Sequence, residues 1–458
     1  MNDLEVIILA AGQGTRMKSR TAKVLHHAAG RPLIDYVLDL ASAISSRPPV
    51  VVVGHQRDAV RQHLGDRARY AVQEPQLGTG HAVQQAVAVL GNEIRGTRVL
   101  ILSGDVPLTR RETLQLLIEE HGRAGNALTL LTMKLDDPAQ YGRIIRDAGG
   151  AVIKIVEAKD ASESERSVSE VNAGIYLFDG AHLTDNLRRL STDNAQREYY
   201  LTDLIAMLRE RGQRVGAMVV DPIEVRGVNS RAELAGAEAE IQRRVVERLM
   251  ADGVTFRNPS TVVIDSSVSI GADSVVYPFV TLEGTTRIGT GCVIEPGVHL
   301  HNVNVGNDVH LKSGTVAEDA IIEDEATVGP YAHLRPGTQL GRRVKVGNFV
   351  ETKKARLGEG AKASHLSYLG DADIGADVNI GAGTITCNYD GVKKHKTILE
   401  DGVFVGSDTQ LVAPVRIGRG AYIGAGSTIT QDVPPDALAL SRAPQKIIEG
   451  WATRRRKK

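Results

Sequence analysis

Two glycines and two basic residues near the start of the chain have the types and spacing to bind a phosphate chain. The apolar run "VIILAA" (6–11) leads into Gly12 and Gly14, and Arg16 and Lys23 follow. Glycines let backbone N–H groups approach phosphate oxygens, and a helix expected behind them would add a favourable dipole. The stretch lacks the third glycine of a G-x-G-x-x-G fingerprint, and no P-loop motif is present. It predicts a phosphate loop of another kind, with an ordinary turn flanked by solvated basic residues as the alternative.

A single carboxylate, Asp105, follows the apolar stretch "VLILSG" (99–104). Open α/β sheets bind ligands beyond the carboxyl ends of their strands, so this position suits a ligand contact. An isolated Asp after a strand is also a common turn former, and the residue alone does not separate these two interpretations.

The elements that must position these residues alternate between strand-like and helix-like segments. "VIILAA", "VVVVG" (50–54) and "RVLILSGDVPL" (98–108) are apolar and rich in β-branched residues, and the amphipathic "PLIDYVLDLASAI" (32–44) lies between them. This alternation predicts an α/β domain with a largely parallel sheet. Residues 230–250 are alanine-rich and free of proline, and Ser230 with Glu233 forms a capping-box pattern, so we expect a connecting helix there.

From residue 253 the pattern changes to a recurring aliphatic-Gly pair. The spacings between pairs include 18, 18, 6, 12 and 6 residues. A six-residue period matches neither a helix nor an alternating strand, but it matches a parallel β-helix in which three hexapeptides close one 18-residue coil. Chance glycines in a β-sandwich are the weaker alternative. The pairs are Ile270-Gly271, Ile288-Gly289, Val305-Gly306, Val328-Gly329, Val346-Gly347, Ile374-Gly375, Ile380-Gly381, Val405-Gly406, Ile417-Gly418 and Ile423-Gly424.

The six-residue period is interrupted twice before the chain leaves it. "ETKKARLGEGAKASHLSYLGDAD" (351–373) and "GAGTITCNYDGVKKHKT" (381–397) are dense in Lys, His, Tyr and Asn. Insertions in a solenoid emerge as loops, often on its binding face, so we expect two functional loops here. Beyond residue 434 the chain departs from the repeat and ends in five basic residues, which predicts a solvated tail.

Composition narrows the function classes. The 458 residues are 42% hydrophobic, and 55 basic residues balance 55 acidic ones. A zero net charge disfavours a broad surface for nucleic acid or anionic membrane. Two cysteines, Cys292 and Cys387, lack metal-ligand spacing and make no disulfide framework. With no signal peptide or spanning segment in the pattern, we expect a cytoplasmic protein.

The motifs taken in order resemble one enzyme family. "LAAGQGTRM", "KVLH", "QLGTGHA", "GDVPL", "YGRI", "VEAKDA", "VNAGIY" and "GVNS" resemble sugar-1-phosphate nucleotidyltransferases. With "LRPGT", "NFVETKKA", "SHLSYLGD", "NIGAGTITCNYDG", "VGSDTQLVAPV" and "SRAPQ", the whole chain resembles the bacterial bifunctional N-acetylglucosamine-1-phosphate uridyltransferase/glucosamine-1-phosphate acetyltransferases. The resemblance implies a Rossmann-like nucleotidyltransferase domain (1–229), a linker helix (230–252), a left-handed parallel β-helix of hexapeptide repeats (253–440) and a tail (441–458).

For the first reaction, the resemblance implies uridylyl transfer from UTP to N-acetylglucosamine 1-phosphate with release of pyrophosphate. Because a sugar-phosphate oxygen attacks phosphorus in line, catalysis is mostly positioning and charge neutralisation. The implied catalytic cations are Arg16 and Lys23, and the implied Mg²⁺ ligands are Asp105 and Asn229. The implied nucleotide contacts are Leu9, Ala10, Ala11, Gly12, Gly14, Lys23, Gln73, Gly78 and Thr79, and the implied acceptor-sugar contacts are Asp105, Gly142, Glu157, Asn172 and Asn229.

For the second reaction, the resemblance implies acetyl transfer from acetyl-CoA to the amine of glucosamine 1-phosphate. That amine must lose a proton before it attacks a thioester, and histidine suits the task of base. His365 matches the family base, and Ser407 could donate to the developing oxyanion. The implied sugar-phosphate contacts are Arg335, Lys353, Tyr368 and Asn379, and the implied acetyl-CoA contacts are Ala382, Asn388, Tyr389, Ser407, Ala425 and Arg442. Lys394 is a further candidate cation.

Some positions depart from the family pattern, and one alternative function stays open. Ala22 stands where proline is usual before Lys23, and Ser103 stands where some relatives carry tyrosine. The main alternative is a nucleotidyltransferase with one activity and a structural or regulatory β-helix. A purely structural solenoid does not account for the phosphate loop together with Asp105. The resemblance also implies a homotrimer with acetyl-transfer pockets between subunits.

Overall fold

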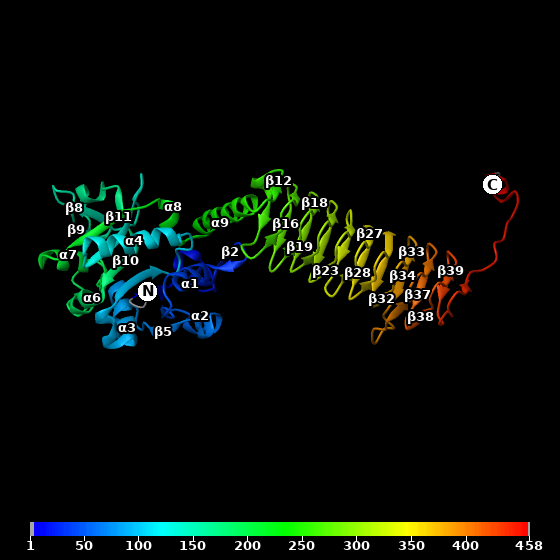
Figure 1. Cartoon of the computed structure of the whole chain (residues 1–458), viewed down its shortest axis with the longest axis horizontal. Coiled ribbons are helices and arrows are strands. Elements are labelled where there is room, and N and C mark those ends of the chain that lie inside the picture. Colours follow the sequence, from blue (N-terminus) through cyan, green and yellow to red (C-terminus); the bar gives the residue numbers. More distant parts are fainter. Residues whose placement is uncertain (1–3, 457–458) are drawn as a thin grey trace. The chain divides into compact units, whose positions relative to one another are not determined.

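The computed structural model describes residues 4–456 (Figure 1). The chain divides into two compact units, one up to Ile241 and one from Gln242 onward. Each unit has its own type of sheet, and each is described by itself.

The first unit is built on a nine-stranded mixed sheet in which seven strands follow the order β11-β7-β10-β6-β1-β4-β5. β1 pairs in parallel with β4 and β6, and only β10 of the central path runs antiparallel to its neighbours. The predicted largely parallel sheet is therefore confirmed, with β10 as the exception. The strands are β1 (Leu4–Ala10), β4 (Val50–Val53), β5 (Arg69–Val72), β6 (Arg98–Ser103), β7 (Leu128–Lys134), β8 (Arg143–Arg146), β9 (Val152–Val156), β10 (Glu170–Asp179) and β11 (Val215–Val219).

Helices cover this sheet and complete two apolar cores. The predicted amphipathic segment forms α1 and contributes Ile34, Val37 and Leu38 to one core, whereas Val83 of α3 packs into the other. Fully buried aliphatic strands such as β4 separate the two cores. The helices are α1 (Leu33–Ile44), α2 (Arg57–Leu64), α3 (Thr79–Leu90), α4 (Arg111–Ala124), α5 (Glu163–Arg166), α6 (Gly180–Leu187), α7 (Asp203–Glu210) and α8 (Pro222–Val225).

The prediction of a helix directly behind the glycine loop is wrong. Only two three-residue 3₁₀ turns follow the loop, Thr15–Met17 and Lys23–Leu25, and the first α-helix begins at Leu33. Gly14 and Lys18 both have left-handed backbone angles, which turn the chain instead of extending a helix. A phosphate bound at this loop would therefore contact the loop's own N–H groups and side chains, without a helix dipole.

The connecting helix is confirmed as α9 (Arg231–Ala251). The Ser230 hydroxyl accepts from the Glu233 N–H at 3.3 Å, as the capping pattern predicted. The Glu233 carboxylate reaches one residue further back than a standard capping box and accepts from the Asn229 N–H at 2.8 Å. The helix start therefore also holds Asn229 in place.

The second unit is a three-sided parallel β-helix, which confirms the interpretation of the hexapeptide period. Its strands form three parallel sheets of 11, 10 and 9 members. Every third strand belongs to the same sheet, except that the last strand, β41 (Leu438–Ala439), pairs with β39 (Tyr422–Ile423). The strands begin with β12 (Thr255–Phe256) and end with β41, and Figure 1 shows them stacked as successive coils. Inward aliphatic residues such as Ile294, Leu311 and Val328 are almost fully buried.

The prediction of an insertion at residues 351–373 is wrong. Residues 351–373 continue the regular coils, because Lys345 pairs with Lys362 and Lys362 pairs with Asn379 at 17-residue steps. The hexapeptide repeat is hard to recognise in this part of the sequence for two reasons. Ala363-Ser364 takes the place of an aliphatic-Gly pair, and many coils contain 17 residues, not 18. The second insertion is a real loop, between β34 (Ile385–Cys387) and β35 (Thr397–Leu399).

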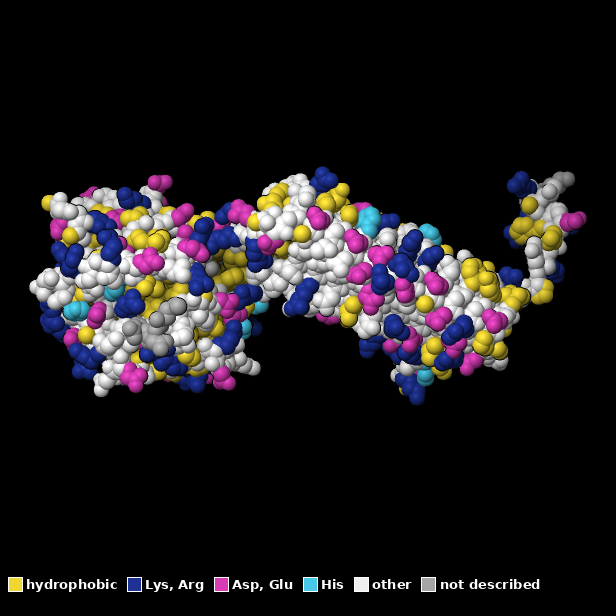
Figure 2. Space-filling view, viewed as in Figure 1, with side chains coloured by type: hydrophobic (Ala, Val, Ile, Leu, Met, Phe, Trp, Pro, Cys, Tyr) yellow, Lys and Arg dark blue, Asp and Glu magenta, His cyan; other side chains and the backbone are white. Residues whose placement is uncertain are grey.

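After β41 the chain leaves the repeat, as predicted. Residues 441–450 are exposed and lack regular structure, and the short helix α10 (Trp451–Arg456) follows. Within the described residues, no helix has the length and apolar character needed to span a membrane. Figure 2 shows basic and acidic side chains interspersed over the visible surface, in keeping with the zero net charge.

Candidate functional site

A pocket of about 510 Å³ lies beyond the carboxyl ends of β1, β5 and β6 in the first unit. This is the position where open α/β sheets bind ligands. Nine of the residues implied by the resemblance line it: Leu9, Ala10, Ala11, Gly12, Lys23, Gln73, Gly78, Thr79 and Asp105. Gly14 and Arg16 are not among its lining residues.

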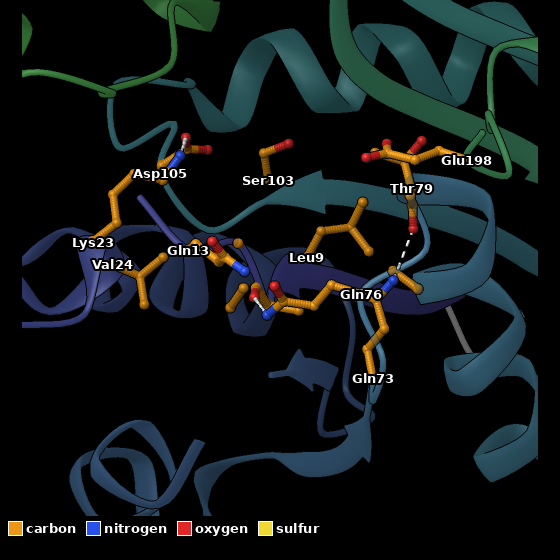
Figure 3. Close-up of a pocket in the computed structure, with 15 residues that line it drawn as sticks. Leu9, Gln13, Lys23, Val24, Gln73, Gln76, Thr79, Ser103, Asp105 and Glu198 are labelled. Atoms are coloured by element: carbon orange, nitrogen blue, oxygen red, sulfur yellow. Dashed lines mark hydrogen bonds and ion pairs between the residues drawn. The ribbon is translucent and has the colours of Figure 1, made fainter. Parts of the chain in front are cut away.

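One end of this pocket is formed by the Lys23 ammonium beside the Asp105 carboxylate (Figure 3). The Lys23 ammonium forms an ion pair with Asp105 and donates to Asn229 Oδ1 at 3.0 Å. Lys23 and Asp105 are each less than one-fifth exposed, so water screens the pair only partly. Gly14 has a φ of 63°, and a Cβ there would lie 2.8 Å from Lys23 Cβ, so glycine allows the lysine stem to cross the loop.

The same oxygens fit a hard divalent cation. Asp105 and Asn229 converge on one positively charged group, and carboxylate and amide oxygens are ligands that Mg²⁺ accepts. Among the described residues, no cluster of three or more His, Cys, Asp or Glu side chains could hold a metal. A Mg²⁺ ion here would therefore need phosphate oxygens or water as further ligands.

The opposite end of the pocket is lined by amides and hydroxyls from the turn before α3 (Figure 3). The buried Gln73 side chain donates to Gly78 O at 2.8 Å, which holds the turn closed. Gly78 has a φ of 98°, and a Cβ would lie 2.7 Å from Tyr199 O. Only glycine fits this position, because the backbone of Tyr199 packs directly against it.

A second group of implied residues lies around Glu157. A cavity of about 420 Å³ is lined by Arg16 and Glu157 together with Lys159. The Asn172 N–H donates to Gly142 O at 2.8 Å, and a Cβ on Gly142 would lie 3.5 Å from the Glu157 carboxyl group. The structure therefore places Gly142, Glu157 and Asn172 together, with Arg16 at the same cavity.

Several polar residues at these cavities were absent from the sequence-based set. Thr202 donates to Glu157 Oε1 at 3.0 Å, and burial raises the pKa of Glu157. Gln76 donates to Ala11 O and links the turn before α3 to the glycine loop. Glu198 also lines the main pocket. These residues belong to no motif quoted above except Gln76 of "QLGTGHA", which could have indicated it.

In the second unit, five residues occupy equivalent positions on successive coils. Val346 pairs with Ala363, Ala363 with Ile380, Ile380 with Val405, and Val405 with Ile423. The residues two positions after these five therefore stack, coil on coil, at a single corner of the β-helix. We call this stack the column. The column consists of Asn348, His365, Ala382, Ser407 and Ala425. Arg442 extends it, because its guanidinium donates to Ala425 O at 2.8 Å.

His365 is exposed at the end of β30 (Lys362–His365), next to β27 (Lys345–Asn348). Its Nδ1 lies 2.7 Å from Asn348 Oδ1, which leaves Nε2 available. The implied base and four implied acetyl-CoA contacts therefore lie along one corner, although the base is on a regular strand and not on an inserted loop.

Three cations lie close together: Arg335 and Lys353 on the adjacent sheet of the β-helix, and Lys394 on the inserted loop. Arg335 and Lys353 are equivalent residues on neighbouring coils, since Leu334 pairs with Thr352 one position earlier. Arg335 forms an ion pair with Glu351 at 2.8 Å. The adjacent Lys394 side chain lowers the pKa of Lys353 by hydrogen bonding and charge repulsion. Such a group of exposed cations suits a phosphate.

Tyr368 and Asn379 differ in their relation to these cations. Tyr368 lies in β31 (Tyr368–Gly370), on the same sheet as Arg335 and Lys353. Asn379 lies in β33 (Asn379–Ile380), on a different sheet of the β-helix. A single chain therefore gathers three of the four implied sugar-phosphate residues on one sheet.

The inserted loop after β34 carries Asn388 and Tyr389 and is closed by Asp390. Asp390 accepts from the N–H groups of Val392 and Lys393 and lies 2.6 Å from His395 Nε2. These contacts, the Lys393 N–H first, lower the pKa of Asp390 to about 2. Asn388 donates to Asp371 Oδ2, which fixes the start of the loop against the coils.

Comparisons with known proteins agree with this two-part architecture. A nucleotidyl transferase family model matches residues 5–222, and a bacterial transferase hexapeptide model of six repeats matches residues 396–431. The chain is 52% identical to a Bifunctional protein GlmU of Pelobacter propionicus, 52% to that of Geobacter metallireducens and 50% to that of Geotalea uraniireducens. In each case the alignment covers 100% of both chains. The hexapeptide match, together with the three stacked parallel sheets, identifies the solenoid as a left-handed β-helix.

Proposed function

This chain belongs to the GlmU family of bifunctional proteins, and from that premise we propose that it makes UDP-N-acetylglucosamine in two steps. The β-helix (253–440) acetylates glucosamine 1-phosphate with acetyl-CoA, and the first domain (1–229) transfers uridylyl from UTP to the product. The product supplies peptidoglycan and lipopolysaccharide synthesis. The observation that carries the proposal is the presence of two separate sites, a charge-neutralising pocket at Lys23 and a corner column that contains His365.

In uridylyl transfer, an oxygen of the sugar phosphate attacks the α-phosphorus of UTP, and the bond to pyrophosphate breaks. No covalent enzyme intermediate is required, so binding geometry and cations carry the catalysis. Lys23 and the N–H groups of the Gly12 loop neutralise the triphosphate, and Arg16 faces the acceptor phosphate from the second cavity. The turn of Gln73, Gly78 and Thr79 receives the base, and Glu157 with Asn172 and Gly142 receives the sugar.

Asp105 and Asn229 are the proposed Mg²⁺ ligands, with Leu9, Ala10, Ala11 and Gly14 shaping the loop beside them. When bound, the ion would neutralise phosphate charge and polarise the reacting phosphorus.

In acetyl transfer, His365 Nε2 removes a proton from the amine of glucosamine 1-phosphate. The amine nitrogen attacks the thioester carbon, the carbon–sulfur bond breaks, and the departing thiolate takes up a proton. Arg335, Lys353, Tyr368 and Asn379 bind the sugar phosphate. Ser407 donates to the oxyanion, and Ala382, Asn388, Tyr389, Ala425 and Arg442 bind the coenzyme.

We propose a homotrimer in the cytoplasm, where UTP and acetyl-CoA are made. The separation of Asn379 from Arg335, Lys353 and Tyr368 on different sheets supports a sugar-phosphate site completed by a second copy. Three bulky apolar side chains at successive coil corners are more than half exposed, and this exposure supports a covering partner: Tyr331, Phe349 and Leu366.

Paired assays test the proposal. Wild-type protein should release CoA thiol from acetyl-CoA and glucosamine 1-phosphate, and pyrophosphate from UTP, Mg²⁺ and N-acetylglucosamine 1-phosphate. Lys23→Ala should abolish only uridylyl transfer, and His365→Ala should abolish only acetyl transfer. If the wild-type protein releases pyrophosphate but no thiol, the bifunctional proposal is wrong. The chain would then be a nucleotidyltransferase with a structural β-helix.

A further inference from the structure

The His365 ring has a neutral side-chain partner that no motif role accounts for. Asn348 Oδ1 lies 2.7 Å from His365 Nδ1, and the two residues pair directly across β27 and β30. Asn348 is half-buried, whereas the imidazole is exposed. The partner is therefore held by the coil below, and the ring projects from it toward the surface where substrate would bind.

The backbone of the next coil packs directly against Gly347 at this corner. A Cβ on Gly347 would lie 1.9 Å from Ser364 O, so only glycine permits the approach. The Leu366 N–H donates to Asn348 O at 3.0 Å, and the Ser367 hydroxyl donates to His365 O at 2.9 Å. The backbones of both residues are thus fixed, which fixes the distance between their side chains.

We infer that Asn348 is a positioning residue for acetyl transfer: its Oδ1 accepts the Nδ1 proton of His365 and so keeps the lone pair on Nε2, facing the amine. The inference rests on the proposed role of His365 as base. A neutral imidazole has one protonated nitrogen, and the partner of that nitrogen determines the tautomer. An amide oxygen fixes the tautomer and the ring orientation without placing a negative charge beside the ring.

The surrounding groups are consistent with this role. Lys345 and Lys362 stand three residues before Asn348 and His365 on the same strands and pair with each other. On the following coil the equivalent position is Ala382, which carries no charge. Among the charged side chains on these three strands, none is a carboxylate that could replace Asn348 as the acceptor.

Asn348→Ala and Asn348→Asp in the full chain test the inference. Asn348→Ala should lower kcat for acetyl transfer by about 10- to 100-fold, because it removes a group that orients the base. The KM values for acetyl-CoA and for glucosamine 1-phosphate should change little. Asn348→Asp keeps an acceptor and should restore most of the rate. Because a carboxylate stabilises the protonated ring, it should also move the acid limb of the pH–rate profile upward by about one pH unit.

Three controls make the outcomes distinct. Uridylyl transfer by the same chain should be unchanged in both variants. Asn307→Ala, which removes another hydrogen bond between coils at 3.0 Å far along the chain from His365, should leave acetyl transfer unchanged. An Asn348→Ala variant with wild-type kcat and pH profile, while His365→Ala is inactive, would overturn this inference alone. Full acetyl transfer in His365→Ala would overturn both the base and its positioning residue.

Discussion

At the scale of single residues, Lys23 is the group on which the first site depends in two ways. Its ammonium occupies the space between Asp105 and Asn229, the oxygens that fit a divalent cation. Lysine and metal would therefore compete for the same oxygens, and the lysine is free to contact phosphate only when the metal displaces it. Binding of the metal and release of the lysine should be linked.

Lys23→Met tests this competition. Removing an ion pair of about 1 kcal/mol should tighten Mn²⁺ binding to the nucleotide-free protein by about five-fold, while uridylyl transfer falls at least about 100-fold. Electron paramagnetic resonance of free Mn²⁺ measures the first effect without relying on activity. Asp105→Asn is the matched control and should weaken binding. Unchanged or weaker Mn²⁺ binding in Lys23→Met would contradict the competition.

Gly78 shows how tightly the base end of the pocket is built. Alanine there would hold a strained φ of 98° and place its Cβ 2.7 Å from Tyr199 O. We expect Gly78→Ala to destabilise the first unit by about 1–3 kcal/mol and to raise the KM for UTP. Thermal unfolding and initial rates measure these effects, and Gly96→Ala, where a Cβ has no neighbour within 4 Å, is the control. Equal stability of the two variants would argue against a strained turn.

At the scale of elements, the loop between β34 and β35 is positioned by one carboxylate. Asp390→Ala removes acceptors for two backbone N–H groups and for His395. The loop should then lose its fixed shape, and acetyl transfer should fall by about ten-fold as Asn388, Tyr389 and Lys394 lose their positions. Asp390→Asn, which can still accept, should be milder. Uridylyl transfer should not change, and a wild-type acetylation rate in Asp390→Ala would show that the loop is not part of the site.

The elements also show what can be predicted from sequence. Periodicity predicted α1 and the β-helix because each buries one regularly spaced apolar face, whereas α9 was predicted from its alanine content and its capping pattern. It failed at residues 351–373, where small residues replace glycine and the coils shorten to 17 residues, so regular strands resembled an insertion. It also failed behind Gly14, where left-handed backbone angles end what the sequence suggested as a helix.

The candidate site was predicted unevenly for a related reason. Residues within a motif, such as Lys23 and Gly78, can be identified from neighbouring letters. Thr202 lies in no quoted motif, and Asn348 lies in "NFVETKKA" without a role assigned to it. They contact residues 45 and 17 positions away, and only the fold brings each pair together. In a β-helix some of these distant contacts can be predicted from sequence, because residues one coil apart lie side by side. Counting back 17 residues from His365 leads to Asn348.

At the scale of the whole molecule, exposed apolar corners support the proposed association of the β-helix with other copies of the chain. Tyr331 and Phe349 stack at 5.8 Å on neighbouring coils, and both have left-handed backbone angles that bulky residues rarely adopt. Strained backbone and exposed aromatic surface both cost free energy in a lone chain. Burial against another copy would offset that cost.

Tyr331→Glu tests this assembly at a position two coils before His365. A buried, unpaired carboxylate should disfavour association, and light scattering should show loss of a species of three times 49.2 kDa. Acetyl transfer should fall with the trimer because a sugar-phosphate site shared between chains would be incomplete, whereas uridylyl transfer should persist. Tyr331→Leu, which keeps an apolar corner, should remain trimeric and active. A monomeric Tyr331→Glu variant with full acetyl transfer would mean that one chain suffices, and a wild-type protein that is already monomeric would rule out the trimer itself.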